Sequence, residues 1–574
     1  MSWIRRLLVS ALLIAAAAVL AAQSPVAPSA AASPPVFVLL VSTIEDHLND
    51  QPSLARIERT LPVVARYRKE HPQFAASWLV RFTGTVSDHL AETNYASHLV
   101  DKLKQAALDG AVEFGYDGTD EPTFVARPRP NFRKAPTPED RWLARVEALE
   151  WFLNEGKDPI TGQPVAERTG GLRRVLDVFG RVEAVRGVTL EIGGDPELAH
   201  LVRRMKLDPL LPGFGETTVF PGRTLAGYRG STGGASAALS PEAGTAPELF
   251  WQDGLLALSE YVGPDSKVFV AREGVEVVRK SFEALDPSRP HVIQVRLGHP
   301  GVYIKPGFGD RRYQTPLEFS YENPRSPHVP ADALRSSEES AAEYAKEDDV
   351  LRWLVTDYFP AHPGSRFVSA AELKRMTGPG SGVDVSQDDV AAAAREVVET
   401  LQKAPLYLPT FVRAGDRYLS LADVFSLLVT SLAHADRSGT LPGAVPLRPL
   451  YGPRGLMNSD ERNVGTRVDR AAVLRACSTL SDALFAPGWM PVPANTVPSG
   501  VSVGEREVSA AQFLLLMADA YLQPVGAREV MLRHVFPFSA VGESFPGTRP
   551  LPDRGTTWTI KPARLLRPAA STSP

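Results

Sequence analysis

A run of six apolar residues at 36–41, VFVLLV, constrains the fold more than any other feature of this sequence. It is continuous and rich in β-branched side chains, which is typical of a strand covered on both faces of a sheet. An amphipathic helix is predicted next, from apolar residues at helical spacing: Leu54, Ile57, Leu61 and Val64. Further strands are predicted at 74–82, 267–271 and 291–297, and further helices at 97–108 and 275–285. This alternation predicts βα units and a parallel sheet.

Composition excludes several classes of protein. The chain has 574 residues, of which 44% are hydrophobic and 22% charged, so it is not wholly disordered, collagen-like or a multi-span membrane protein. Its net charge of −4 gives no reason to expect a nucleic-acid or anionic-membrane partner. A single cysteine, Cys477, excludes an internal disulfide and a Cys-rich zinc site. Because it lies in an amphipathic stretch, we expect Cys477 to be a small buried hydrophobe.

The amino end predicts export. Arg5 and Arg6 precede an apolar run at 7–22 that ends in small residues suited to signal peptidase. The run is shorter than the roughly 20 apolar residues of a membrane span. We therefore expect a signal peptide at 1–22, a Pro/Ala/Ser linker at 23–35, and a mature chain without a membrane span in the periplasm, the cell envelope or the extracellular space. An uncleaved anchor is the alternative, and it also places the chain outside the cytoplasm.

The pattern changes in the second half of the chain. The α/β pattern of 36–331 is followed by a charged, Ala/Ser/Glu-rich stretch at 332–348, which predicts a connector. After it, 349–545 predicts a mostly α-helical domain, and 546–574 predicts a C-terminal tail. The helical domain contains an internal repeat, with copies at about 389–435 and 470–523.

The two copies align at an offset of 89 residues. Matched pairs include Pro409 and Pro498, Val412 and Val501, and Leu427 and Leu516. Each copy predicts a hairpin that turns at a glycine, Gly415 or Gly504. A helix then begins after a capping serine, Ser420 or Ser509. Two such copies form either a binding module or a duplicated packing unit that covers the α/β part.

Acidic residues follow the first strand and a later turn. Glu45, Asp46 and His47 come just past the carboxyl end of the first predicted strand, where parallel α/β folds hold their active sites. A second acidic cluster includes Asp117 and Glu121, which face one side if that segment is helical. These acids form either a metal site or a group of solvated carboxylates at the rim of the fold.

The order and spacing of these residues resemble the polysaccharide deacetylases of the carbohydrate esterase type, which fold as an irregular (β/α) barrel. The first family motif, T-F-D-D-G, lies over 43–47. The second, H-E-I-G-N-H-T-x-S-H-P, lies over 112–122 and matches at Glu113, Gly115 and Pro122. The last motif, a strand that ends in Leu-x-His, is similar to 295–300. The family's R-P-P-Y motif has no clear counterpart in this sequence.

The resemblance implies a role for each matching residue. Glu45 is implied as the general base and His299 as the general acid. Asp46 is implied as a metal ligand, and Asp117 and Glu121 stand where the family has two ligand histidines. Three carboxylates favour harder ions such as Ca²⁺, Mg²⁺ or Mn²⁺ over the zinc that suits an Asp/His/His site. The alternative for His299 is a hydrogen-bonded residue at the rim.

Two other features of the sequence are candidates for contact with a polymer. The segment 251–254 is either an aromatic platform for a sugar or a core edge with a turn at Gly254. The repeats are weakly similar to pseudomurein-binding repeats, which hold surface enzymes on cell-wall polymers. The Ser-x-x-x-Phe spacing of those repeats is kept at Ser509 and Phe513.

Two functions are therefore open from the sequence. The first is an exported deacetylase-like enzyme that uses a divalent metal to remove acetyl groups from an envelope or extracellular glycan. The second is an inactive deacetylase-like protein that binds a polysaccharide or a peptidoglycan-type polymer.

Overall fold

The apolar run that opens the folded chain forms strand β1, Val36–Ile44, at the centre of a parallel sheet. The sheet has the order β4-β3-β2-β1-β8-β7, and the short strand β9 pairs with the amino half of β1. The other strands are β2 (Trp78–Phe82), β3 (Val112–Asp117), β4 (Val185–Thr189), β7 (Val268–Val270), β8 (His291–Arg296) and β9 (Arg366–Phe367). The predicted mixed α/β fold with a parallel sheet is confirmed.

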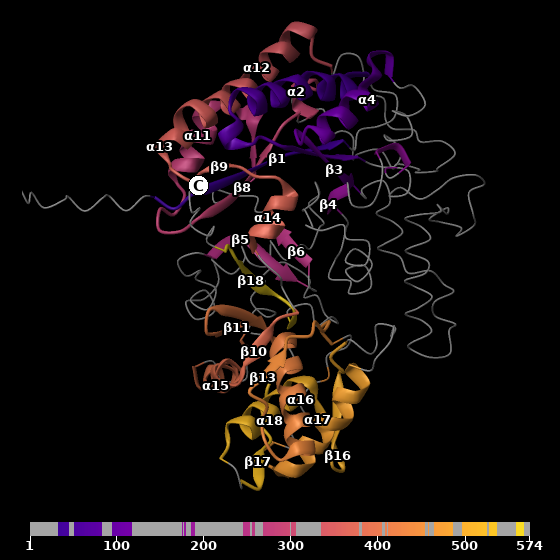
Figure 1. Ribbon diagram of the computed structural model, residues 1–574, viewed down its shortest axis with the longest axis vertical. Helices are drawn as coiled ribbons and strands as arrows, with labels where there is room; N and C mark the ends of the chain where they lie inside the picture. The colour runs from indigo at the N-terminus through magenta and orange to yellow at the C-terminus, as the bar shows by residue number, and fades with distance from the viewer. Residues whose placement is uncertain are drawn as a thin grey trace, which may run out of the picture.

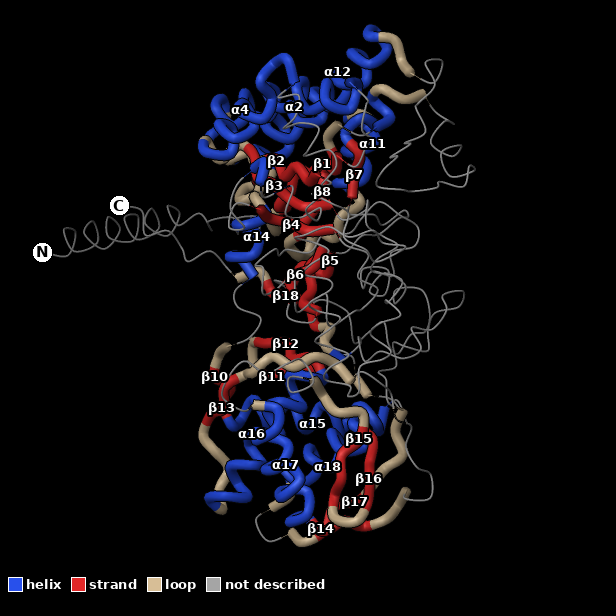
Figure 2. Tube along the Cα trace, turned by 90° about the vertical axis from the view of Figure 1, so that its right-hand side faces the viewer, coloured by secondary structure: helices blue, strands red, loops and turns tan. Residues whose placement is uncertain are grey.

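The structure is a computed structural model. It describes residues 33–44, 51–82, 95–117, 175, 177–179, 185–189, 245–252, 255–258, 268–298, 300–305, 334–377, 382–403, 408–409, 411–453, 457, 464–485, 496–524, 527–536 and 558–566. The α/β part lies above a helical part in both views of the molecule (Figures 1 and 2). Within the described residues, no strand pairing joins β4 to β7.

The second strand is shorter than the sequence predicts. The prediction begins at residue 74, whereas β2 begins at Trp78. Pro72 begins a 3₁₀ turn, η1 (Pro72–Phe74), and Ala75 has a left-handed φ of 46°. This turn interrupts the extended run before β2.

The helices next to these strands in sequence lie on one face of the sheet (Figure 1). They are α2 (Gln51–Glu70), α4 (Tyr95–Leu108), α11 (Val275–Glu283) and α12 (Ser337–Trp353). A π-helical turn, η8 (Leu354–Tyr358), continues α12 into α13 (Phe359–Ala361), and 3₁₀ turns follow β7 (η4, Ala271–Glu273) and β8 (η5, Pro300–Val302). Alternate residues of β1, such as Val38 and Leu40, pack in one core with Leu61 of α2 and Phe282 of α11.

A smaller sheet and one helix cover the opposite face of the parallel sheet. Strands β5 (Thr245–Gln252) and β6 (Leu255–Leu258) form an antiparallel pair, and β18 (Lys561–Arg564) pairs with β5. Helix α14 (Ala370–Thr377) lies beside them. Phe37 and Leu39 of β1 pack here against Leu249 and Trp251 of β5 and Leu373 of α14.

The stretch 332–348, expected as a connector, is corrected by the structure. Most of it belongs to helix α12, which Ser336 and Glu339 begin with a reciprocal capping box. Leu351 lies in the same core as α2 and α11. The apolar stripe that would have predicted a helix is missing, because buried positions of α12 carry the acids Glu343 and Glu347.

The helical part contains two copies of one unit, built as strand, helix, hairpin, helix and strand. The first copy comprises β10 (Asp384–Ser386), α15 (Gln387–Lys403), β11 (Phe411–Ala414), β12 (Arg417–Ser420), α16 (Leu421–Ser438) and β13 (Ala444–Pro446). The second comprises β14 (Arg467–Asp469), α17 (Arg470–Leu484), β15 (Gly500–Val503), β16 (Arg506–Ser509), α18 (Ala510–Leu522) and β17 (Glu529–Met531). In each copy the first and last strands pair antiparallel.

The predicted hairpins and helix caps are confirmed. Gly415 and Gly504 occupy the turns with φ of 59° and 61°, a region that favours glycine. The hydroxyls of Ser420 and Ser509 each accept, at 3.2 Å, the backbone N–H three residues further on.

These caps allow a first prediction. We expect Ser509→Ala to lower the free energy of unfolding by about 0.5–2 kcal/mol, since a capping hydroxyl contributes that much. Urea denaturation followed by circular dichroism measures the change. Ser502→Ala, an exposed serine of the same hairpin, should stay within about 0.5 kcal/mol of wild type. Equal effects of the two changes would contradict the capping role.

The two copies pack on each other reciprocally. Helix α15 of the first copy packs on α18 of the second, and α16 packs on α17. This is the exchange of equivalent contacts that two-fold symmetry produces. Within each copy the same backbone bond recurs, because Gly382 donates its N–H to Leu447 O at 2.9 Å and the equivalent Gly465 donates to Leu532 O at 2.8 Å. The copies also end alike, in LRPLY at 447–451 and LRHVF at 532–536.

The C-terminal segment 558–566 contradicts the tail expected at 546–574. Trp558 is buried in the core of the helical part, and Ile560 is buried in the core under the α/β helices. Ala563 and Leu565 lie in the core on the opposite face of the parallel sheet. The segment therefore joins both parts of the molecule. Its apolar residues are too few to show a period in the sequence.

Candidate functional site

The carboxyl ends of β1, β2 and β3 lie level at one edge of the parallel sheet, and β8 ends slightly earlier in the register. Ile44 ends β1 and pairs with Phe82 at the end of β2, which in turn pairs with Tyr116 of β3. On the other side, Arg296 ends β8 and pairs with Val41 of β1. From the spacing of neighbouring strands, the ends of β1 and β3 lie roughly 10 Å apart. This is the edge at which α/β folds hold their active sites.

Only one of the five residues assigned to the site from the sequence falls within the described residues. Asp117 is the last residue of β3, and its backbone is in register with Thr189 of β4. Among the residues that the structure describes, no group of three or more His, Cys, Asp or Glu side chains could hold a metal. The other assigned residues, and the side chain of Asp117, lie outside the described part: Glu45, Asp46, Glu121 and His299.

The face of the sheet opposite the helices, here called the inner face, changes from apolar to polar toward this edge. Phe37 and Val292 lie near its amino end and are buried in an apolar core. Strand alternation places Arg81 of β2 and Gln294 and Arg296 of β8 on the same face nearer the carboxyl end. Arg81 is 1% exposed and Arg296 is 7% exposed. Two buried guanidinium groups therefore flank β1 at the candidate site.

Glu113 of β3, which matches the second motif of the deacetylases, has a structural role. Its carboxylate accepts the N–H of Ala370 at 2.7 Å and the N–H of Ala371 at 3.2 Å, in the first turn of α14. The first amides of a helix have no partner within the helix, and the helix dipole favours a negative charge there. Glu113 therefore fixes α14 against the inner face.

The chain turns sharply where it leaves β8. Gly298 has a φ of +61°, a conformation that favours glycine. The hydroxyl of Ser42 in β1 donates to the carbonyl oxygen of Leu297. The indole N–H of Trp78 in β2 donates to the oxygen of Ser42 at 2.9 Å. Side chains of the two neighbouring strands thus hold the first peptide of the turn.

Charged side chains from two helices bind the backbone N–H and carbonyl groups of Gly298 in the same turn. Arg56 of α2 donates from Nη1 to the carbonyl oxygen of Gly298 at 2.6 Å. Glu347 of α12 accepts the N–H of Gly298 with both carboxylate oxygens, each at 3.0 Å. Arg335 donates from Nε to the carbonyl oxygen of Gly301 in η5 at 2.9 Å. The segment after β8 is therefore fixed on several sides.

Glu343, one turn before Glu347 on α12, lies among positive charges near η5. Burial alone would raise its pKa, but a hydrogen bond from Lys346 and the charges of Lys346, Arg335 and Arg272 hold the pKa below its ordinary value. The carboxylate therefore stays ionised at neutral pH.

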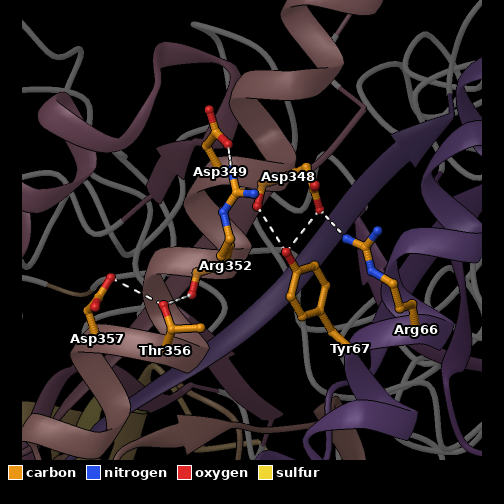
Figure 3. A network of polar contacts seen from close by, with 7 residues as sticks. All are labelled: Arg66, Tyr67, Asp348, Asp349, Arg352, Thr356 and Asp357. Carbon is orange, nitrogen blue, oxygen red and sulfur yellow. Dashed lines mark hydrogen bonds and ion pairs between the residues drawn. The ribbon is translucent and has the colours of Figure 1, made fainter.

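Helices α2 and α12 are also joined by a second polar network, which does not involve the turn (Figure 3). Arg66 of α2 donates to Asp348 Oδ1 at 2.5 Å, and the hydroxyl of Tyr67 donates to the same oxygen at 3.0 Å. Burial, together with this hydrogen bond to Asp348, raises the pKa of Tyr67 to about 12. The other contacts in the figure are local to α12 and η8 and involve Asp349, Arg352, Thr356 and Asp357.

The buried charged residues of this region were not predicted from the sequence. Arg81 did carry a signal, because it interrupts an otherwise apolar strand, WLVRF. Arg296 ends HVIQVR, a strand that also contains His291 and Gln294, so its signal was weaker. Charged groups are rarely buried unless they are paired or hydrogen-bonded. Glu347 and Arg56 carried no such signal, since each lies in a helix rich in charges.

Two predictions about single residues are resolved. Trp251 is 6% exposed and lies in the core against the inner face, so its ring is part of that core and not a sugar platform. Asp253 and Gly254 lie outside the described residues. Cys477 is fully buried, as expected. Burial raises the pKa of its thiol well above the ordinary value.

Comparison with known proteins gives few matches. The chain matches no protein-family profile and no curated protein. A similar solved structure is the 4-alpha-glucanotransferase from Thermococcus litoralis, with a TM-score of 0.31, 10% identity, and coverage of 64% of this chain and 46% of that one. The chain thus spans about half the length of that structure. No helix among the described residues is long and apolar enough to cross a membrane. The candidate site is therefore assigned from its own residues.

Proposed function

We propose that the α/β part is a (β/α) barrel of the polysaccharide deacetylase type. We also propose that the chain is exported and acts on an envelope or extracellular glycan. The observation that carries the barrel is the winding of the sheet, since the path β7-β8-β1-β2-β3-β4 runs in one direction, with α2, α4, α11 and α12 on one face. Right-handed crossovers place all helices on one side only when the winding does not reverse. A doubly wound sheet reverses at its first strand and carries helices on both faces.

The inner face supports a site at the carboxyl edge. In a closed (β/α) barrel this face is an interior filled by strand side chains, whereas here β5, β18 and α14 pack on its apolar part, so the proposed barrel is irregular. Catalytic residues of such barrels come from the carboxyl ends of the strands. In the proposed enzyme Glu45 takes the proton from the attacking water, and His299 protonates the leaving group. Asp46, Asp117 and Glu121 would hold a divalent cation, whose chemistry is to polarise the carbonyl and acidify a bound water. Three carboxylates fit a hard ion better than zinc.

A second candidate is an inactive barrel that binds the same class of glycan. The sequence favours it, because both histidine ligand positions of the family carry acids, Asp117 and Glu121. Without the two imidazole ligands the site no longer has the donor set that suits a hydrolytic zinc ion.

Acetate release from chitin oligomers and acetylated peptidoglycan, with metal analysis of the purified protein, separates the two candidates. We expect Glu45→Gln to lower the rate by about 10²–10⁴-fold, since that is the contribution of a positioned base. A chelator should also abolish the activity. Asp101→Asn, which changes an exposed acid on α4, should leave the rate unchanged. Acetate yields unaffected by Glu45→Gln and by chelation would remove the enzymatic proposal, and glycan binding without acetate release would support the second candidate.

A further inference from the structure

The turn after β8 is held by groups that an ordinary surface turn does not need. Glu347 is 4% exposed and Arg56 is 1% exposed, and both direct their charge at the peptide groups of Gly298. Burying an ionised side chain is costly unless it is well hydrogen-bonded. Water would satisfy the same N–H and carbonyl groups if the turn were only a connection. The two buried charged side chains therefore hold this turn in one position.

The backbone of Leu297, directly before Gly298, is fixed as well. The N–H of Leu297 donates to Val41 O at 3.0 Å, and its carbonyl oxygen accepts from Ser42. Reorienting the turn would break bonds to β1, α2 and α12 together. The next residue along the chain is His299, the proposed general acid, which the sequence alone places at the end of the last strand.

We propose that Glu347 and Arg56 are positioning residues for His299, because they fix the backbone at Gly298, the residue directly before it in the sequence. This inference rests on the proposed function. A general acid must lie within hydrogen-bond reach of the atom that it protonates, about 2.6–3.2 Å. A displacement of about 1 Å lowers the rate on the order of 100-fold. These contacts of Glu347 and Arg56 with Gly298, here called the clamp, thus act on the chemical step and not on substrate binding.

The experiment compares Glu347→Ala with Asp348→Ala. Asp348 is the next residue on α12 and also joins α12 to α2, through Arg66 and Tyr67, but these bonds do not reach the turn (Figure 3). We expect Glu347→Ala to lower kcat for acetate release on the order of 100-fold, with KM unchanged within about twofold. Asp348→Ala should keep kcat within about threefold of wild type. Glu347→Gln keeps one acceptor oxygen for the N–H of Gly298 and should restore part of the rate.

A second readout does not depend on activity. Diethyl pyrocarbonate modifies accessible histidines, and peptide mass spectrometry gives the rate at His299 relative to His434, an exposed residue of α16. The relative rate should change in Glu347→Ala and stay at the wild-type value in Asp348→Ala. If Glu347→Ala does not melt cooperatively, Glu347→Gln and Arg56→Lys replace it in both measurements.

The outcomes separate this inference from the proposed function. If the wild type releases acetate and the two alanine variants behave alike, Glu347 only holds helices together and the inference is wrong. If the wild type releases no acetate, the enzymatic function fails, and the labelling rate decides the inference alone. An unchanged rate at His299 in Glu347→Ala would then overturn it.

Discussion

Trp558→Ala is expected to lower the free energy of unfolding by about 3–5 kcal/mol. The indole of Trp558 is fully buried in the core of the helical part, with its ring centroid 6.3 Å from that of Phe425 in an edge-on arrangement. Truncation removes the largest buried side chain of the C-terminal segment and leaves a cavity that a packed core fills only in part. Urea denaturation measures the change, with unfolding monitored by far-UV circular dichroism, a backbone signal that does not require tryptophan.

The control for this prediction lies in the same segment. Leu566 is 52% exposed, so Leu566→Ala should change the free energy of unfolding by no more than about 0.5 kcal/mol. A loss below about 1 kcal/mol in Trp558→Ala would mean that the segment is not docked in solution. The expected loss would instead establish that residues near the C-terminus complete the core of the helical part.

Lys561→Met is expected to have a comparable effect, about 3–5 kcal/mol, through charge and not through packing. Lys561 Nζ lies 2.7 Å from Asp423 Oδ2, and both side chains are 9% exposed. The same carboxylate oxygen accepts the N–H of Ser420 at 2.9 Å in the cap of α16. Loss of the ammonium leaves a buried carboxylate without its counter-charge. Thermal or urea unfolding of the purified variant measures the loss.

A double variant tests whether this loss comes from the unpaired charge. In Lys561→Met with Asp423→Asn, the amide oxygen still accepts the N–H of Ser420 but no charge remains, so most of the stability should return. Arg467→Met removes one partner of an exposed ion pair with Glu529 and should cost no more than about 1 kcal/mol. A double variant as unstable as Lys561→Met alone would refute the explanation.

Trp558 and Lys561 lie in the C-terminal segment, where the first repeat copy contacts strand β18. The hairpin strand β12 of the first copy lies against β18, and Arg564 donates from Nη1 to the carbonyl oxygen of Asp416 in the hairpin turn at 2.6 Å. The position equivalent to Asp423 in the second copy is Gln512, whose amide donates to Arg533 O at 3.2 Å. The first copy therefore packs on the α/β part, as expected if the repeats are a duplicated packing unit. The second copy makes no equivalent ion pair among the described residues.

Local patterns were sufficient for part of the fold. The apolar run of β1 predicted a central strand, because a strand buried on both faces has no polar alternation. The hairpin turns at Gly415 and Gly504 were predictable, because a left-handed φ selects glycine. The caps at Ser420 and Ser509 depend on residues three positions apart, which the sequence displays directly.

The candidate site was predictable only in its location. The ends of β1 and β3 lie at one edge because parallel strands share their direction, and this follows from the alternation of strands and helices. The clamp on Gly298 was not predictable, since Arg56 precedes it by 242 residues and Glu347 follows it by 49. No local period relates such positions.

The sequence by itself determined the elements that depend on near neighbours: the parallel βα units, the duplicated unit and its caps. Only the tertiary structure decided that α12 is a packed helix, that the C-terminal segment lies in three cores, and which buried charges bind the turn after β8. The physical reason is the range of the interactions. Backbone geometry and capping act within a few residues, whereas burial of Glu347 and Trp558 depends on partners that only the folded chain brings together.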